Sequence, residues 1–162
     1  MLMNKKVLYI SVFIISFLVI FAGLYWFLIK SKSDPLKRAE ITVGSQTFSV
    51  EIADSLKSRA RGLSGHAPLG DTMGMYFSFP IKAKYSFWMK DMAYPLDIIW
   101  IADGKVLGVS ENVPVPQNNN ILNLPTYSPP EAIDSALEIN AGSVKKFNIS
   151  IGDIVSVDRQ KP

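Results

Sequence analysis

The segment LDIIWIADGKVLGVSE, residues 96–111, predicts a β-hairpin. Isoleucine, valine and tryptophan dominate its two halves, and these residue types are enriched in strands. The Asp103-Gly104 pair between the halves suits the two-residue turn that hairpins prefer. This segment therefore indicates a β-rich fold.

Strand patterns recur on both sides of this hairpin. In AEITVGSQTFSVEIA, residues 39–53, apolar and polar residues alternate around a Gly44-Ser45 turn, which predicts a second hairpin. Single strands are predicted at MGMYFSFP (73–80), YSFWMK (85–90), SALEIN (135–140) and GDIVSVD (152–158). The stretch 112–134 is rich in Pro and Asn and lacks a period, so it predicts a long loop.

Two short helices interrupt these strands. The first, within 54–63, is predicted to start at a cap residue, Asp54 or Ser55, and to end at Gly62. The second, within 142–148, is predicted to be capped by Ser143 and ended by Asn148. Because strands dominate, we predict a mainly β fold, a compact β-sandwich or barrel with one or two short helices.

The first 29 residues predict a membrane anchor. VLYISVFIISFLVIFAGLYWFLI, residues 7–29, carries no charge. As a helix rising about 1.5 Å per residue it spans roughly 34 Å, enough for a hydrocarbon core of about 30 Å. A cleaved signal peptide is the alternative, but its apolar core is normally only about 7–15 residues long. We therefore predict a single transmembrane helix in the lipid bilayer, a polar linker at 30–38, the β-domain at 39–158 and a tail at 159–162.

Charge and composition exclude several classes of function. The chain has a net charge of +3 at pH 7, but residues 39–162 hold 11 Lys and Arg against 13 Asp and Glu, a balance of −2 (11 minus 13). The positive excess thus lies beside the predicted span, where it can meet anionic headgroups. A nucleic-acid partner needs a basic face on the folded domain, so none is predicted. The absence of cysteine excludes disulfides and thiolate chemistry.

The stretch SFWMKDMAYPLDIIW, residues 86–100, contains the first candidate site. Alternation along a strand places Phe87 and Met89 on one face and Trp88 and Lys90 on the other. In the following strand, Asp97 shares a face with isoleucines and must find hydrogen-bond donors there. The candidate donors are Lys90, Arg59, Arg61 and the backbone amides of the Tyr94-Pro95 turn. We favour a structural clamp over a reactive carboxylate, since structural ion pairs perturb pKa values as well.

Glu138 raises the same question, because it lies between Leu137 and Ile139 in a predicted strand. If Glu138 met Asp97 across strands, the two carboxyl groups could act as a general acid and base of the glycosidase kind, with Arg59 as an electrostatic partner. The same pair could instead accept a bidentate hydrogen bond from Arg59 and lock the fold.

Several of these motifs together resemble a known family. RARGLSGHAPL, MGMYFSF, SFWMKDMAYPLDIIWI, YSPPEAIDSALEINAG and GDIV occur in the order and spacing of the uncharacterised family catalogued as domain of unknown function 192, over roughly residues 41–157. The resemblance implies a compact, mainly β sandwich of jelly-roll type. It brings no settled activity with it.

The resemblance also bears on His66 and on orientation. The family usually has an arginine where this chain has His66, so an anion site would be weakened here or depend on pH. Many members carry an N-terminal signal or anchor, which implies an extracytoplasmic domain. Basic residues alone favour the opposite orientation, because more of them follow the span than precede it: Lys30, Lys32, Lys37 and Arg38 against Lys5 and Lys6.

Three functions follow from these features. The first is a non-catalytic binding module for a small polar ligand, a glycan or a protein segment, which would bind near the 112–130 loop and the 85–95 turn. Its predicted contacts are Trp88, Lys90, Asp91, Tyr127 and His66. The second is a hydrolase-like enzyme that uses Asp97 and Glu138, and the third is a scaffold for another envelope protein. No cofactor or metal is predicted, since a lone histidine cannot build a zinc site.

Overall fold

The computed structural model describes residues 14, 17, 19–21, 36–118 and 120–158. Residues 14, 17 and 19–21 are helical and belong to a first unit, 1–35, whereas residues 36–162 form a second compact unit. Among the described residues, no helix is both long enough and apolar enough to cross a membrane. The predicted anchor at 7–29 lies largely outside the described residues, as do most of the linker and the whole tail at 159–162.

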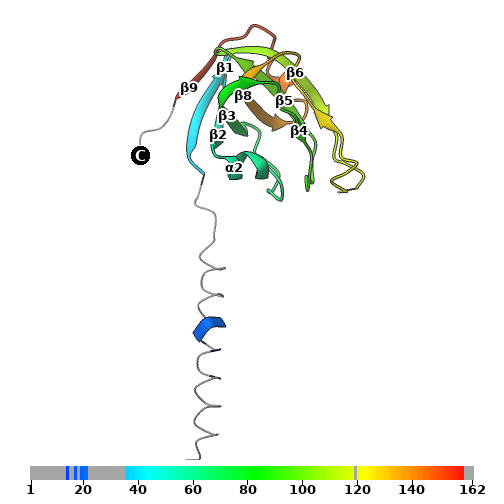
Figure 1. Ribbon diagram of the computed structural model, residues 1–162. Coiled ribbons are helices and arrows are strands. Elements are labelled where there is room, and N and C mark those ends of the chain that lie inside the picture. Colours follow the sequence, from blue (N-terminus) through cyan, green and yellow to red (C-terminus); the bar gives the residue numbers. More distant parts are fainter. Residues whose placement is uncertain (1–13, 15–16, 18, 22–35, 119, 159–162) are drawn as a thin grey trace, which may run out of the picture. The chain divides into compact units, whose positions relative to one another are not determined.

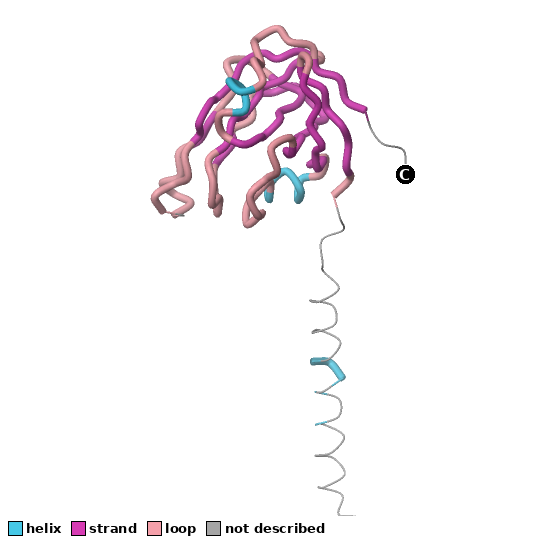
Figure 2. Tube along the Cα trace, turned by 180° about the vertical axis from the view of Figure 1, so that it is seen from behind, coloured by secondary structure: helices cyan, strands magenta, loops and turns pink. Residues whose placement is uncertain are grey.

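Strands dominate the second unit, so the prediction of a mainly β fold is confirmed (Figures 1 and 2). Seven of them form one sheet in the order β6-β5-β8-β3-β2-β1-β9, and only the β2–β3 pair is parallel. Their bounds are β1 (Arg38–Val43), β2 (Gln46–Ala53), β3 (Met73–Ala83), β5 (Leu96–Ala102), β6 (Lys105–Val113), β8 (Ile133–Asn140) and β9 (Val155–Asp158). The short strands β4 (Phe87–Trp88) and β7 (Thr126–Tyr127) form a separate two-stranded sheet.

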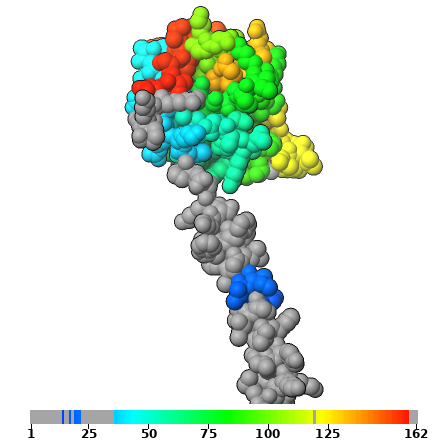
Figure 3. All heavy atoms as spheres, turned by 60° about the vertical axis from the view of Figure 1, so that its left-hand side comes forward, coloured from blue at the N-terminus to red at the C-terminus, as the bar shows by residue number. Residues whose placement is uncertain are grey.

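The large sheet is strongly curled, so that its two edge strands, β6 and β9, approach each other at one end. The first and last strands, β1 and β9, pair with each other and lie side by side in cyan and red in Figure 3. Lys105, at the start of the edge strand β6, forms an isolated bridge with Ile154, just before the other edge strand, β9. The Val106 N–H donates to the Asp153 carbonyl at 2.9 Å in the same region. The result is a half-barrel made of one curled sheet, in place of the two facing sheets expected for a jelly-roll-like sandwich.

Both faces of this sheet carry an apolar core. Alternation along β5 assigns Leu96, Ile98 and Trp100 to one core, and Ile99 and Ile101 to the other, as the sequence predicted. We call the core with Trp100 the pocket-side core; it also contains Met75, Phe77, Phe87, Met89 and Met92. The β4–β7 sheet therefore covers part of the sheet face on which this core lies.

The structure confirms the predicted turn at Asp103-Gly104 and the predicted cap of the first helix, but not the predicted cap of the second. Asp103 and Gly104 both have positive φ, 52° and 70°, as the primed hairpin turn requires. Helix α2 (Leu56–Arg61) is capped by Ser55 and ended by Gly62 at φ 52°. Helix α3 (Ser143–Lys146) follows Gly142 and has no side-chain cap, so the prediction that Ser143 caps it is wrong. Ser143 is instead its first helical residue and is buried.

Candidate functional site

Asp97 is a structural clamp in the core opposite the pocket-side core. Its side chain is fully buried, and each of its carboxylate oxygens accepts a backbone hydrogen bond. The N–H of Asn112 donates to Oδ1 at 2.8 Å, and the N–H of Val144 donates to Oδ2 at 2.9 Å. These bonds tie β5 to the end of β6 and to α3. The prediction of the donors to Asp97 is therefore wrong. It named Lys90, Arg59, Arg61 and the amides of the Tyr94-Pro95 turn, whereas the donors are backbone N–H groups of β6 and α3.

Glu138 lies on the opposite face of the sheet. In the β5–β8 register it pairs with Ile98, whereas Asp97 pairs with Ile139. Because paired residues point to the same face, Glu138 points toward the pocket-side core and Asp97 away from it. The two carboxyl groups therefore do not form the acid–base pair of the hydrolase hypothesis, although their strands are neighbours.

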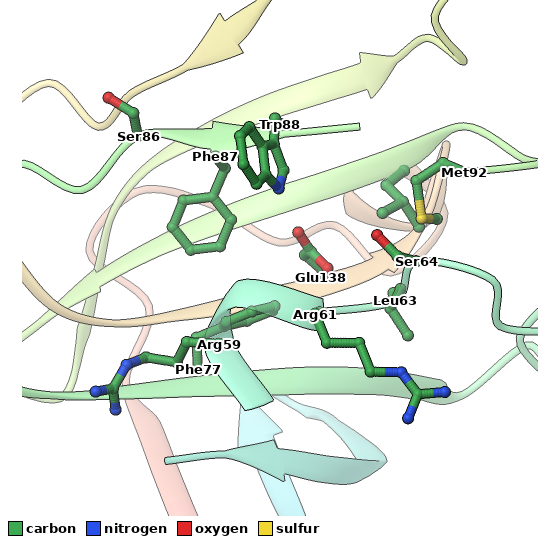
Figure 4. A pocket seen from close by; sticks show the side chains of 12 residues that line it. Arg59, Arg61, Leu63, Ser64, Phe77, Ser86, Phe87, Trp88, Met92 and Glu138 are labelled. Atoms are coloured by element: carbon green, nitrogen blue, oxygen red, sulfur yellow. The ribbon is translucent and has the colours of Figure 1, made fainter. Parts of the chain in front are cut away.

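Glu138 forms the floor of a small pocket of about 60 Å³, which we call the Glu138 pocket. Figure 4 shows its carboxyl group at the centre, with the hydroxyl of Ser64 and the indole nitrogen of Trp88 turned toward it. The guanidinium groups of Arg59 and Arg61 are turned away from it in the same view. The remaining lining is mostly apolar and comes from Gly62, Leu63, Phe77, Ser86, Phe87, Met92 and Leu96.

The Glu138 side chain is buried, but its carboxyl oxygens open into the pocket, since no side-chain polar atom of the described residues is sealed off without a partner. Its side chain is 4% exposed, and burial raises its pKa to about 8. No hydrogen bond or cation from the described part of the chain offsets this burial. Burial, and then the charge of Glu138, raise the pKa of the neighbouring Tyr94, whose hydroxyl donates to the Ala67 carbonyl at 3.1 Å. The carboxyl group is thus protonated at neutral pH and can both donate and accept a hydrogen bond.

Arg59 is engaged elsewhere. Its Nη1 donates to the Ser78 carbonyl at 2.8 Å, and its guanidinium lies over the ring of Phe79 at 5.6 Å. These contacts hold α2 against β3. Arg59 therefore fixes the helix that forms one wall of the pocket, and it does not pair with Asp97 or Glu138 as the sequence suggested.

A tight turn at 62–66 brings Ser64 to the pocket. Its Oγ donates to the Lys90 carbonyl at 2.6 Å, and the N–H of Gly65 donates to the Asp91 carbonyl at 3.2 Å. The hydroxyl proton of Ser64 is therefore already used in this hydrogen bond, and toward a ligand the Ser64 oxygen can act only as an acceptor. Sequence reasoning missed Ser64, because its position depends on this contact with residues far along the chain.

The predicted ligand contacts separate into two groups. Trp88 lines the pocket and is 41% exposed, so its ring is available to a ligand. The others are not among the residues that line it. Nζ of Lys90 lies 2.9 Å from Oδ2 of Asp91, and Tyr127 pairs with Phe87 in the β4–β7 sheet. His66 lies beside Glu51, with Nε2 3.8 Å from Oε2.

An apolar hollow of about 390 Å³ adjoins the Glu138 pocket and shares Arg59, Phe77, Ser86 and Phe87 with it. Its other lining residues are Leu56, Ala60, Phe79, Pro80 and Tyr85. A ligand larger than the pocket can therefore rest against apolar surface. Among the described residues, no three His, Asp or Glu side chains gather as metal ligands.

Comparison with known proteins gives a family and a fold. The model of the family DUF192, described as an uncharacterized ACR, matches residues 39–157. A protein from Sinorhizobium meliloti 1021, proposed as a transcription regulator, is 27% identical with a TM-score of 0.68, over 77% of this chain and 97% of that chain. A protein of unknown function from Novosphingobium aromaticivorans DSM 12444 is 28% identical with a TM-score of 0.69, over 77% and 89% of the two chains. No curated protein matches the chain.

Proposed function

The chain belongs to the family of domain of unknown function 192, and we propose that it is a membrane-tethered, extracytoplasmic binding module for a small polar ligand or glycan. The tether is the uncharged run at 7–29, and the bilayer is its partner. The ligand-binding site is the Glu138 pocket. A polar group of a protein segment is a further possible occupant of the same pocket.

One observation carries this proposal: the carboxyl group of Glu138 is desolvated, with burial as the cause of its raised pKa, and its oxygens open into a pocket where a ligand can reach them. Burying a polar group without a partner costs roughly 1–3 kcal/mol in protein mutational data. A purely structural carboxyl group would find donors, as Asp97 does on the other face. Glu138 destabilises the fold, and a ligand that hydrogen-bonds to it would offset this cost.

The other functions have less support. A hydrolase of the glycosidase kind needs two carboxyl groups around one cleft, and Asp97 faces the wrong side of the sheet. The regulator role proposed for the Sinorhizobium meliloti relative would require a nucleic-acid surface or another partner. Residues 39–162 carry a balance of −2, so we do not extend that role to this chain as a nucleic-acid binder.

Replacing Glu138 tests the proposal. Glu138→Leu should raise the free energy of unfolding by about 1–3 kcal/mol, because it removes an unpartnered buried carboxyl group. Glu111→Leu, at an exposed glutamate of β6, is the matched control and should give no comparable gain. Thermal or denaturant unfolding measures both. A Glu138→Leu variant that is less stable than the wild type would make Glu138 a structural residue and remove the basis of the proposal.

Ligand screening is the second part of the test. A thermal-shift screen of the full chain against sugars and small polar compounds should find compounds that raise Tm by mass action. Glu138→Leu should abolish these shifts, whereas Glu111→Leu should retain them. If no compound in a broad panel shifts the wild type, the envelope-scaffold hypothesis would replace the binding module.

A further inference from the structure

We propose that the Glu138 pocket takes the acetamido group of an N-acetylated sugar, an inference that rests on the proposed binding function. An acetamido group combines a carbonyl acceptor, an N–H donor and a methyl group within four heavy atoms. Each of these three parts has a counterpart among the side chains that line the pocket.

The hydrogen-bonding groups match an amide. At neutral pH the carboxyl group of Glu138 is protonated and can donate to the carbonyl oxygen of the ligand. Ser64 has already donated its proton to the Lys90 carbonyl, so its oxygen can accept from the amide N–H. Both residues line the pocket, and Figure 4 shows the Ser64 hydroxyl turned toward the Glu138 carboxyl.

The size of the pocket and the apolar side chains on part of its wall suit a methyl group. The pocket measures about 60 Å³, which is more than the roughly 10–15 Å³ needed by one water but far below the roughly 300–1,000 Å³ of sites that enclose a whole ligand. It therefore takes a group of a few heavy atoms, and the rest of the ligand stays outside. Leu63, Phe77 and Met92 supply the apolar wall that the acetyl methyl would contact.

Charge in the pocket disfavours the main alternative, an organic amine. A cation would have to ionise Glu138, and the other charged residues that line the pocket, Arg59 and Arg61, are both positive, although their guanidinium groups point away from Glu138. Tyr94 is another titratable group beside Glu138, and burial, followed by the charge of Glu138, raises its pKa above the ordinary value. A neutral donor–acceptor group needs no such ionisation and leaves Glu138 in its protonated form.

Trp88 favours a sugar as the carrier of the acetamido group. Its ring is 41% exposed at the pocket, where it can stack on the apolar face of a pyranose. An acetylated lysine offers the same acetamido group on a flexible alkyl chain without such a face. The two sources therefore differ in how much they depend on Trp88.

The test is an NMR titration of the full chain in a sugar-free detergent, with N-acetylglucosamine, glucosamine, glucose, acetamide and N-acetyl-lysine methylamide as probes. N-acetylglucosamine should shift the indole N–H of Trp88 and the amide of Ser64 saturably, and glucose and glucosamine should not. Trp88→Ala should weaken N-acetylglucosamine binding at least tenfold and leave acetamide binding unchanged. Equal loss for acetamide, or tighter binding of the acetyl-lysine probe than of the sugar, would overturn the sugar assignment.

The dependence on pH separates the neutral from the ionised carboxyl group. Because Glu138 must stay protonated, affinity for N-acetylglucosamine should be constant up to about pH 7 and fall about tenfold by pH 9. Glu138→Gln keeps a donor and an acceptor, so it should bind within a few-fold of the wild type with no pH dependence. Glu138→Leu should not bind.

Two outcomes would contradict the inference and leave the proposed function intact. Glucosamine could bind better than N-acetylglucosamine and tighten as the pH rises, which would make the pocket an amine site. Alternatively, a compound without an acetamido group could show the only Glu138-dependent thermal shift. The absence of any Glu138-dependent ligand would instead overturn the proposed function itself.

Discussion

At the residue level, two buried carboxyl groups on neighbouring strands have opposite effects on stability. Asp97 accepts two backbone hydrogen bonds and closes the contact of β5 with α3. Glu138 accepts none from the described chain and is held in its protonated form by burial. Identical chemistry thus stabilises the protein at Asp97 and destabilises it at Glu138, because only Asp97 meets backbone donors.

Asp97→Asn should destabilise the protein by about 1–3 kcal/mol. An asparagine keeps one acceptor, but its NH₂ group would face the N–H of Asn112 or Val144 and leave that donor buried without a partner. Denaturant unfolding measures the loss. Asp134→Asn is the matched control, since Asp134 accepts an exposed bond from the Asp103 N–H at 2.8 Å, and its loss should be smaller. If both variants lost the same free energy of unfolding, the burial of the two hydrogen bonds to Asp97 would add no stability beyond that of an exposed bond.

Glu138 should make stability depend on pH. Its pKa rises from 4.5 to about 8 on folding, so between these values the folded state holds a proton that the unfolded state has lost. The stability that comes from keeping this proton is therefore fully present below about pH 4.5, and it is lost as the pH rises toward 8. The free energy of unfolding of the wild type, minus that of Glu138→Gln, should fall by about 1.4 kcal/mol per pH unit in this range. A flat difference would show that Glu138 is ionised in the folded protein.

At the level of single elements, local patterns were predictable from the sequence and contacts between elements were not. The β5–β6 hairpin follows from its Asp103-Gly104 turn, and α2 from Ser55 and Gly62, because these signals lie within a few residues of one another. The faces of β5 follow from a period of two. The donors to Asp97 are 15 and 47 residues away, and no local pattern identifies them.

The candidate site was predictable to a similar extent. Glu138 and Trp88 stand out in the sequence as a carboxyl group within an apolar strand and an aromatic ring on the face opposite Phe87. The idea that Glu138 meets Asp97 was wrong because pairing in register, Ile98 with Glu138, places the two carboxyl groups on opposite faces. No local pattern in the sequence shows which residue of β5 pairs with Glu138.

The contact between β3 and β8 depends on Gly74. A Cβ built at this residue would lie 2.6 Å from the Glu138 carbonyl oxygen, which is backbone and cannot move aside. Gly74→Ala should therefore destabilise the protein by about 1–3 kcal/mol, as overpacking does. Gly70→Ala is the control, since its Cβ would meet only the flexible Met73 side chain. Thermal unfolding compares the two, and equal stability would mean that β3 shifts freely against β8.

At the level of the whole molecule, the proposed outward orientation can be tested by chemical labelling. The chain has no cysteine, so a single introduced thiol is a unique label site. Leu122→Cys, at an 87% exposed side chain, should react with a membrane-impermeant maleimide in intact spheroplasts. Ala136→Cys, at a fully buried residue, should not react, which controls for unfolding. Labelling of Leu122→Cys only after lysis would place the domain in the cytoplasm, as the basic residues after the predicted span favour.

The pairing of β1 with β9 also affects how the protein is made. β1 is synthesised first among the strands, yet its outer partner comes from the last residues of the chain. At about 5–20 residues per second, a ribosome needs on the order of ten seconds to deliver that partner. During this time Ile41 and Val43 lack part of their final cover, and β1 presents an open edge to other chains. The outer edge of β1 therefore stays unpaired until β9 has been synthesised.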